Sequence, residues 1–176
     1  MATVMSRKII IGVMGAGETA TPADLDHAYQ LGQLIAQQGW VLLTGGRHAG
    51  VMDAASRGSK AAGGLTLGIL PGKDTQGVSP AVDIAIVTDL GNARNNINVL
   101  TCDGVIACGM GMGTASEIAL ALKNGKPVIL LTNHQPAQDF FLSLAPSQVK
   151  VVATPEAAIQ AIDFWFQKPP KSTHLC

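Results

Sequence analysis

Short apolar runs alternate with longer amphipathic stretches along most of this 176-residue chain. The run Ile9–Met14 precedes a helical pattern that opens at Thr21-Pro22, and the run Trp40–Leu43 precedes another at Val51–Ala62. Near-continuous apolar strands separated by helices are typical of a parallel sheet that is covered on both faces. We therefore expect an α/β fold, a Rossmann-like doubly wound parallel sheet with helices on both faces.

The alternation continues to the last quarter of the chain. Further strands are predicted at 65–70, 84–87, 104–108, 127–131 and, as a short edge strand, 149–152, and further helices at 93–100, 114–123 and 154–166. Residues 132–148 carry no predicted element. Since neither a repeat nor a linker interrupts the pattern, we expect one domain over residues 1–176, with its core at about 8–167 and a flexible tail at 168–176.

The charge balance narrows the classes of partner. Lys plus Arg and Asp plus Glu each number 12, so the net charge is zero and only 14% of residues are charged. Nucleic-acid binding is not expected, because a duplex-binding protein usually carries a basic surplus. No apolar run reaches the roughly 18 residues that span a bilayer, and no signal peptide is evident, so we expect a cytoplasmic protein without membrane contact.

Three of the predicted strands end in glycine-rich turns, each followed by a helix. These turns are Gly15-Ala16-Gly17, Gly45-Gly46 and Gly109-Met110-Gly111-Met112-Gly113-Thr114. Ligands of open α/β sheets bind beyond the carboxyl ends of the strands, where glycine allows close approach and helix N-termini present unpaired N–H groups. Three such turns on one edge predict a cradle for a small anion, although each turn alone is more typical of an ordinary strand-to-helix connection.

The sequence lacks the motifs that are typical of several cofactor classes. The first turn is without the third glycine of GxGxxG and no acidic residue ends the second strand, so NAD is not expected, and the absence of GxxxxGK[ST] excludes a P-loop. None of the lysines ends a strand at the glycine-rich edge, which argues against pyridoxal phosphate. The histidines and acidic residues do not cluster, so no metal site is predicted. Cys108 either packs as a small hydrophobe or contacts the ligand.

Two later segments carry side chains suited to an anion. Arg94 offers a planar fork for an oxyanion, and Asn92, Thr114 and Ser116 offer neutral hydrogen bonds. Arg47 follows Gly46 and is either a ligand contact or part of a solvated turn. Glu117 follows Thr114 by three residues, so the two either face the ligand together or form a capping box.

These segments resemble a known family. The GxGTxxE pattern after a strand, followed by Gly-Lys-Pro-Val, is similar to the Lonely Guy cytokinin-activating phosphoribohydrolases, once labelled lysine decarboxylase-like, over about Ile9–Leu131. Arg94 matches the family's arginine, whereas Asn95 stands where that family has lysine and Gly109-Met110-Gly111 replaces its Pro-Gly-Gly. With these departures the chain looks more like the branch that contains the molybdenum cofactor carrier proteins of algae and their bacterial homologues.

The resemblance to the carrier branch implies binding, protection and carriage of the molybdenum cofactor, a phosphorylated pyranopterin, without chemistry on it. The residues expected to contact the cofactor are Gly15, Ala16, Gly17, Gly45, Gly46, Arg47, Asn92, Arg94, Gly109, Met110, Gly111, Met112, Gly113, Thr114, Ser116 and Glu117. The alternative is a phosphoribohydrolase that cleaves the N-glycosidic bond of nucleoside monophosphates, with Arg94 and Glu117 as its catalytic residues. Enzyme activity therefore stays open at this point.

The resemblance also implies a homodimer or homotetramer. The segment Ser116–Leu122 is apolar nearly all round, which is typical of a helix buried by more than its own sheet. We expect a second subunit to cover this helix together with the helix at 93–100; the alternative is that the C-terminal helix covers it.

Overall fold

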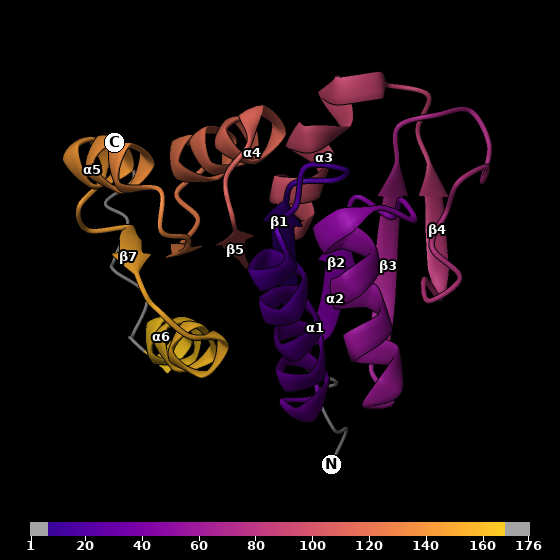
Figure 1. The fold of residues 1–176 in the computed structure, drawn as a ribbon, viewed down its shortest axis with the longest axis horizontal. Helices are drawn as coiled ribbons and strands as arrows, with labels where there is room; N and C mark the ends of the chain where they lie inside the picture. The colour runs from indigo at the N-terminus through magenta and orange to yellow at the C-terminus, as the bar shows by residue number, and fades with distance from the viewer. Residues whose placement is uncertain (1–6, 168–176) are drawn as a thin grey trace, which may run out of the picture.

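The structure, a computed structural model, describes residues 7–167, so the predicted tail at 168–176 lies outside the described residues. Its strands form one parallel sheet in the order β4-β3-β2-β1-β5-β6-β7, with β4 at one end and β7 at the other (Figure 1). The strands are β1 (Ile10–Gly15), β2 (Val41–Thr44), β3 (Leu65–Leu70), β4 (Ile84–Val87), β5 (Gly104–Cys108), β6 (Val128–Leu131) and β7 (Val149–Val151).

Helices cover both faces of the sheet, which confirms the predicted Rossmann-like doubly wound fold. They are α1 (Pro22–Gln37), α2 (Gly50–Ala61), α3 (Arg94–Thr101), α4 (Met112–Lys123), α5 (Gln135–Leu144) and α6 (Pro155–Gln167), and a 3-10 turn, η1 (Gly91–Ala93), precedes α3. Residues of α1, α2 and α6 share one apolar core with the sheet, and residues of α3, α4 and α5 share the other. Figure 1 shows α1 and α2 side by side over their face of the sheet.

The order in which strands are added to the sheet reverses between β1 and β5. These two strands pair in parallel, from Ile11 opposite Gly104 to Gly15 opposite Cys108. Strands β2, β3 and β4 lie on one side of this switch point, and β6 and β7 lie on the other. Because every strand is parallel, all seven carboxyl ends meet at one edge of the sheet. A crevice outside that edge, at the switch point, is where folds of this kind bind their ligands.

Sequence and structure differ mainly in the stretch without a predicted element. Helix α5 occupies most of it, beginning with Pro136 in its first turn and with the His134 ring accepting a hydrogen bond from Ala137 N at 3.2 Å. The C-terminal helix α6 packs with α1, on the face opposite α4, so it does not cover α4 as the alternative proposed. Among residues 7–167, no helix combines the length and the apolar character that crossing a membrane requires.

Candidate functional site

The three glycine-rich turns lie together at the carboxyl edge of the sheet. Gly15 ends β1, Gly45 follows β2 and Gly109 follows β5, and these three strands are neighbours in the order β2-β1-β5. Residue 15 must be a glycine, because a Cβ there would collide with Val51 at the start of α2 and with the Cys108 carbonyl. The turns therefore meet at the switch point, as the sequence predicts.

A small cavity of about 150 Å³ opens between these turns and the starts of α3 and α4. We call it the arginine cavity. Six of the residues expected at the site line it, namely Gly15, Gly45, Asn92, Arg94, Gly113 and Glu117, together with Val13, Met14, Met52 and Asn95. Residues from the first and second halves of the chain thus meet in one enclosure.

Arg94, the first residue of α3, gives the arginine cavity its positive charge. Its guanidinium group lies against Gly45, where a Cβ would collide with both terminal nitrogens. The Nη1 atom is buried and has no hydrogen-bond partner within residues 7–167. Burial lowers the pKa of Arg94 and Glu117 partly opposes this effect, yet an arginine stays charged in proteins. The cavity therefore holds a cationic donor that an anionic oxygen would satisfy.

Glu117, on α4, is the acidic group of the arginine cavity and is only 7% exposed. Asn98 Nδ2, from α3, donates to Glu117 Oε1 at 2.8 Å. Burial raises the pKa of Glu117, and this outweighs the opposite effects of Asn98 and Arg94. The carboxyl group therefore binds a proton more readily than an exposed glutamate, which suits an acid or a base. Asn98 is absent from the predicted site, although its place four residues after Arg94 puts both on one helix face.

Helix α4 begins without a side-chain cap. Its N-cap is Gly111 and the helix starts at Met112, two residues before the predicted start, so the capping-box interpretation of Thr114 and Glu117 is wrong. Thr114 is instead inside the first turn, where its Oγ1 is buried without a hydrogen-bond partner among the described residues. By contrast, Thr21 and Asp24 form a capping box at the start of α1. The start of α4 therefore keeps its unpaired amides for a ligand.

Other predicted contact residues are already engaged within the chain. The Ala16 carbonyl accepts from Val51 N at 3.0 Å, which occupies an amide at the start of α2. The Ser116 hydroxyl donates to Gly113 O at 2.8 Å and accepts from Asn95 Nδ2 at 2.8 Å. Arg47 lies at the surface, 3.7 Å from Glu18, and Met112 is 93% exposed. The donors that remain available to a ligand are therefore mainly the Arg94 guanidinium and the first amides of α4.

A second cavity, of about 400 Å³, lies at the same edge over β5, β6 and β7. We call it the aspartate cavity; it is lined by Thr19, Thr21, Ala23, Asp24, His27, Gly109, Met110, Leu131, Thr132, Asn133, His134, Val152 and Ala153. Two predicted site residues, Gly109 and Met110, are in this lining. The other predicted residues line neither cavity: Ala16, Gly17, Gly46, Arg47, Gly111, Met112, Thr114 and Ser116. That they contact a ligand stays a prediction.

Cys108 belongs to the core and lines neither of the two cavities. Its Sγ donates to the Asp24 carbonyl at 3.3 Å. Burial raises the pKa of Cys108 to about 12, so the group is a protonated thiol at neutral pH. A thiol of this kind is chemically inert, which favours the packing interpretation of Cys108.

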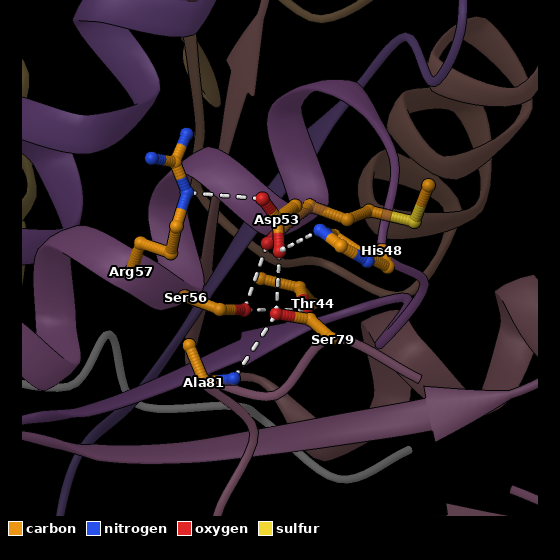
Figure 2. A network of polar contacts seen from close by, with 8 residues as sticks. Thr44, His48, Asp53, Ser56, Arg57, Ser79 and Ala81 are labelled. Carbon is orange, nitrogen blue, oxygen red and sulfur yellow. Dashed lines mark hydrogen bonds and ion pairs between the residues drawn. The ribbon is translucent and has the colours of Figure 1, made fainter. Parts of the chain in front are cut away.

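A buried polar network holds the turn after β2 in place (Figure 2). Asp53, on α2, accepts from Ser79 Oγ at 2.6 Å and from Arg57 Nε at 3.0 Å, and His48 Nε2 lies 3.7 Å away. Ser79 N in turn donates to Gly46 O at 2.9 Å. The segment before β4 is thereby fixed to the turn that packs Gly45 against Arg94.

The fold and the two cavities define a Rossmann-like domain with an arginine-bearing cavity at its carboxyl edge. Residues 8–159 match the SLOG cluster4 family, and the chain belongs to this family. The predicted resemblance is thereby confirmed.

This chain aligns with nearly the whole length of two similar solved structures. One is a molybdenum cofactor binding protein from the phototrophic bacterium Rippkaea orientalis, which is 64% identical with a TM-score of 0.90 over 91% of this chain and 98% of that chain. Another is the molybdenum cofactor carrier protein of Chlamydomonas reinhardtii, at 52% identity and a TM-score of 0.86 over the same shares.

A more distant relative is an enzyme. The cytokinin riboside 5′-monophosphate phosphoribohydrolase of Mycobacterium tuberculosis is 31% identical over 115 residues, which is 61% of this chain and 62% of that one. Both branches of the predicted resemblance are therefore represented, and the carrier branch has the higher identity and coverage.

Proposed function

We propose that this chain binds and carries the molybdenum cofactor, a phosphorylated pyranopterin. The observation that carries the proposal is the buried Nη1 of Arg94, which has no partner in the described chain and lies in a cavity beside the uncapped start of α4. An anionic oxygen of the cofactor would supply the missing acceptor. The likeness to cofactor-binding proteins at 64% and 52% identity supports the pterin as the ligand.

The chain's own residues then hold and shield the ligand. Arg94 and the first amides of α4 bind anionic oxygens, and the Thr114 hydroxyl adds a neutral hydrogen bond. Asn95, at the position of the hydrolases' lysine, donates to Ser116 and brings no charge. The ligand is thus bound mainly by donors that do not act as general acids or bases at neutral pH. A homo-oligomer in the cytoplasm, with no nucleic-acid partner, completes the proposal.

A retention experiment tests this function. The purified protein is loaded anaerobically with the cofactor and desalted, and the retained molybdenum and pterin are measured. We expect the wild type to retain both and Arg94→Gln to retain at least about tenfold less, because a charged hydrogen bond is lost. Arg7→Gln is the matched control, since Arg7 is 69% exposed and pairs with Asp103 away from the cavity. Wild-type protein that retains no cofactor would overturn the proposal.

The second candidate is a phosphoribohydrolase. It is favoured by the raised pKa of Glu117, which suits general acid–base chemistry at a ribose, and by the relative at 31% identity. Release of the free base from an adenosine 5′-monophosphate-type substrate, lost in Glu117→Gln, would support it. Cofactor retention without base release supports the carrier.

A further inference from the structure

The arginine cavity is too small for the whole proposed ligand. Its volume is about 150 Å³, whereas small-molecule sites usually measure roughly 300–1,000 Å³. A volume of this size accommodates a phosphate or another oxyanion. The remainder of an extended pterin must lie elsewhere on the same edge.

The aspartate cavity is the adjoining space. The turn after β5 connects the two cavities, with Gly109 lining the aspartate cavity and Gly113 lining the arginine cavity. The turn after β1 does the same, with Gly15 lining the arginine cavity and Thr19 lining the aspartate cavity. Since four residues of extended chain reach at most roughly 14 Å, one elongated ligand can enter both cavities.

The two cavities differ in charge. The arginine cavity contains the Arg94 guanidinium, whose Nη1 has no hydrogen-bond partner among the described residues, beside the carboxyl group of Glu117. The aspartate cavity contains the carboxylate of Asp24 and has no arginine or lysine in its lining. A carboxylate repels phosphates and accepts hydrogen bonds through both of its oxygens. The aspartate cavity therefore suits the part of the ligand that is uncharged and carries two neighbouring N–H donors.

The carboxylate of Asp24 is held in a fixed position. Its Oδ2 accepts from Thr21 N at 3.0 Å in the capping box, and the same residue's N–H donates to Thr21 Oγ1 at 3.2 Å. The group also packs on Gly109, where a Cβ would come within 2.7 Å of Asp24 Oδ1. The hydrogen bond from Thr21 N uses Oδ2, and no described residue donates to Oδ1, so the lining of the aspartate cavity holds a carboxylate oxygen that is fixed in place and available as an acceptor.

We propose that Asp24 recognises the aminopyrimidinone edge of the pterin in the aspartate cavity while the arginine cavity holds the ligand's anionic end. This inference rests on the proposed function and adds the basis of its specificity. The pterin edge carries N3–H and a 2-amino group side by side, which matches the two oxygens of a carboxylate. Adenine presents an amino donor beside a ring nitrogen acceptor, so one Asp24 oxygen would face a lone pair. The site therefore selects pterins and disfavours adenine nucleotides.

The test compares two fluorescent probes that differ in one group. These are 6-hydroxymethylpterin phosphate and the corresponding lumazine phosphate, in which oxygen replaces the 2-amino group. Wild-type protein should bind the pterin probe about 10-fold to 100-fold more tightly, as expected for hydrogen bonds to a charged group. In Asp24→Asn this preference should fall to near unity, because the amide turns one acceptor into a donor. Asparagine keeps an oxygen for Thr21 N, so the start of α1 remains capped.

Asp26→Asn is the matched control, because this substitution removes the same charge from the same helix. Asp26 accepts a hydrogen bond from Gln30 and does not line the aspartate cavity. It should keep the wild-type preference. A second variant, Ala153→Phe, fills the aspartate cavity without touching Asp24's charge. It should weaken binding of both pteridine probes at least about tenfold and leave inorganic phosphate binding unchanged.

The outcomes separate this inference from the proposed function. Equal wild-type affinity for the two probes, or an unchanged preference in Asp24→Asn, would overturn the role of Asp24 and leave the carrier function standing. If neither probe binds, retention of the intact cofactor decides: Asp24→Asn protein that retains as much as the wild type sinks the inference. Wild-type protein that retains none removes the proposed function and the inference with it.

Discussion

At the scale of single residues, Glu117 controls the charge of the arginine cavity. When ionised it repels an anion that Arg94 attracts, and when protonated it does not. Because the pKa of Glu117 is raised, we expect anion affinity to increase as the pH falls through a range above the usual one for glutamate. Glu117→Gln should bind anions as tightly as the protonated wild type does, which is up to about tenfold more tightly than the ionised wild type. The affinity of this variant should not depend on the charge state of residue 117.

Isothermal titration with inorganic phosphate between pH 5 and 8, corrected with a reference protein for the ionisation of phosphate, measures this effect. The exposed Glu156→Gln on α6 is the control and should follow the wild-type profile. A wild-type affinity that is independent of pH after this correction would show that Glu117 keeps one charge state throughout.

Gly45 is the second residue with a specific expectation. A methyl group there would collide with the Arg94 guanidinium and the Met52 sulfur, which are the ends of flexible side chains. We expect Gly45→Ala to displace Arg94 and to lower ligand affinity about tenfold or more, with less than about 1 kcal/mol lost from the free energy of unfolding.

Titration with the ligand and urea denaturation of the same samples check both parts of this expectation. Gly72→Ala is the matched control, because nothing lies within 4 Å of a Cβ at that position. Equal affinities in the two variants would mean that the position of Arg94 does not govern binding.

At the scale of helices and strands, apolar periodicity predicted every strand, within one or two residues. It failed at α5, which follows the polar connection Thr132–His134: His134 is the N-cap of this helix and Pro136 lies in its first turn. The start of α4 was misplaced because a threonine followed by a glutamate three residues later is typical of a capping box. In the structure Gly111 takes the cap position and the threonine enters the helix.

The candidate site was predictable where it depends on strand ends and not where it depends on side-chain direction. Parallel strands bring their glycine turns to one edge, so the meeting of Gly15 and Gly45 follows from topology, whereas the contact of the Arg94 guanidinium with Gly45 does not. Periodicity does not reveal that Ser116 turns back to Gly113, or that Gly109 faces a different cavity from Gly113. Both facts depend on the path of a single turn.

The contact between α2 and the segment before β4 also depends on tertiary packing and could not be predicted from the sequence. Asp53 connects them through Ser79, which is 1% exposed. Asp53→Ala leaves that hydroxyl without its acceptor, so we expect a loss of about 1–3 kcal/mol in the free energy of unfolding and faster amide exchange at 77–79. Urea denaturation and hydrogen exchange measure these effects. The exposed Asp26→Ala should cost less than about 0.5 kcal/mol, and equal losses in the two variants would contradict a structural role for the network.

At the scale of the whole molecule, the face that carries α3, α4 and α5 keeps apolar side chains at the surface. Leu100, Phe140 and Leu144 are 49%, 57% and 65% exposed, and α6 packs on the opposite face. A cavity of about 360 Å³ between α4 and α5 has a mostly apolar lining that includes Phe140 and Leu144. With a net charge of zero, the chain has little electrostatic repulsion to keep such surfaces apart in solution.

We therefore predict a homodimer or homotetramer in which this face is buried. Light scattering after size-exclusion chromatography should give a mass of two or four chains for the wild type. Leu144→Glu places a charge in the predicted contact and should shift the protein towards monomer, by at least about tenfold in the dissociation constant. Gln160→Glu, an exposed position of α6 on the opposite face of the sheet, adds the same charge; it is the control and should keep the wild-type mass. A monomeric wild type would mean that α3, α4 and α5 expose their apolar side chains to water in the native protein.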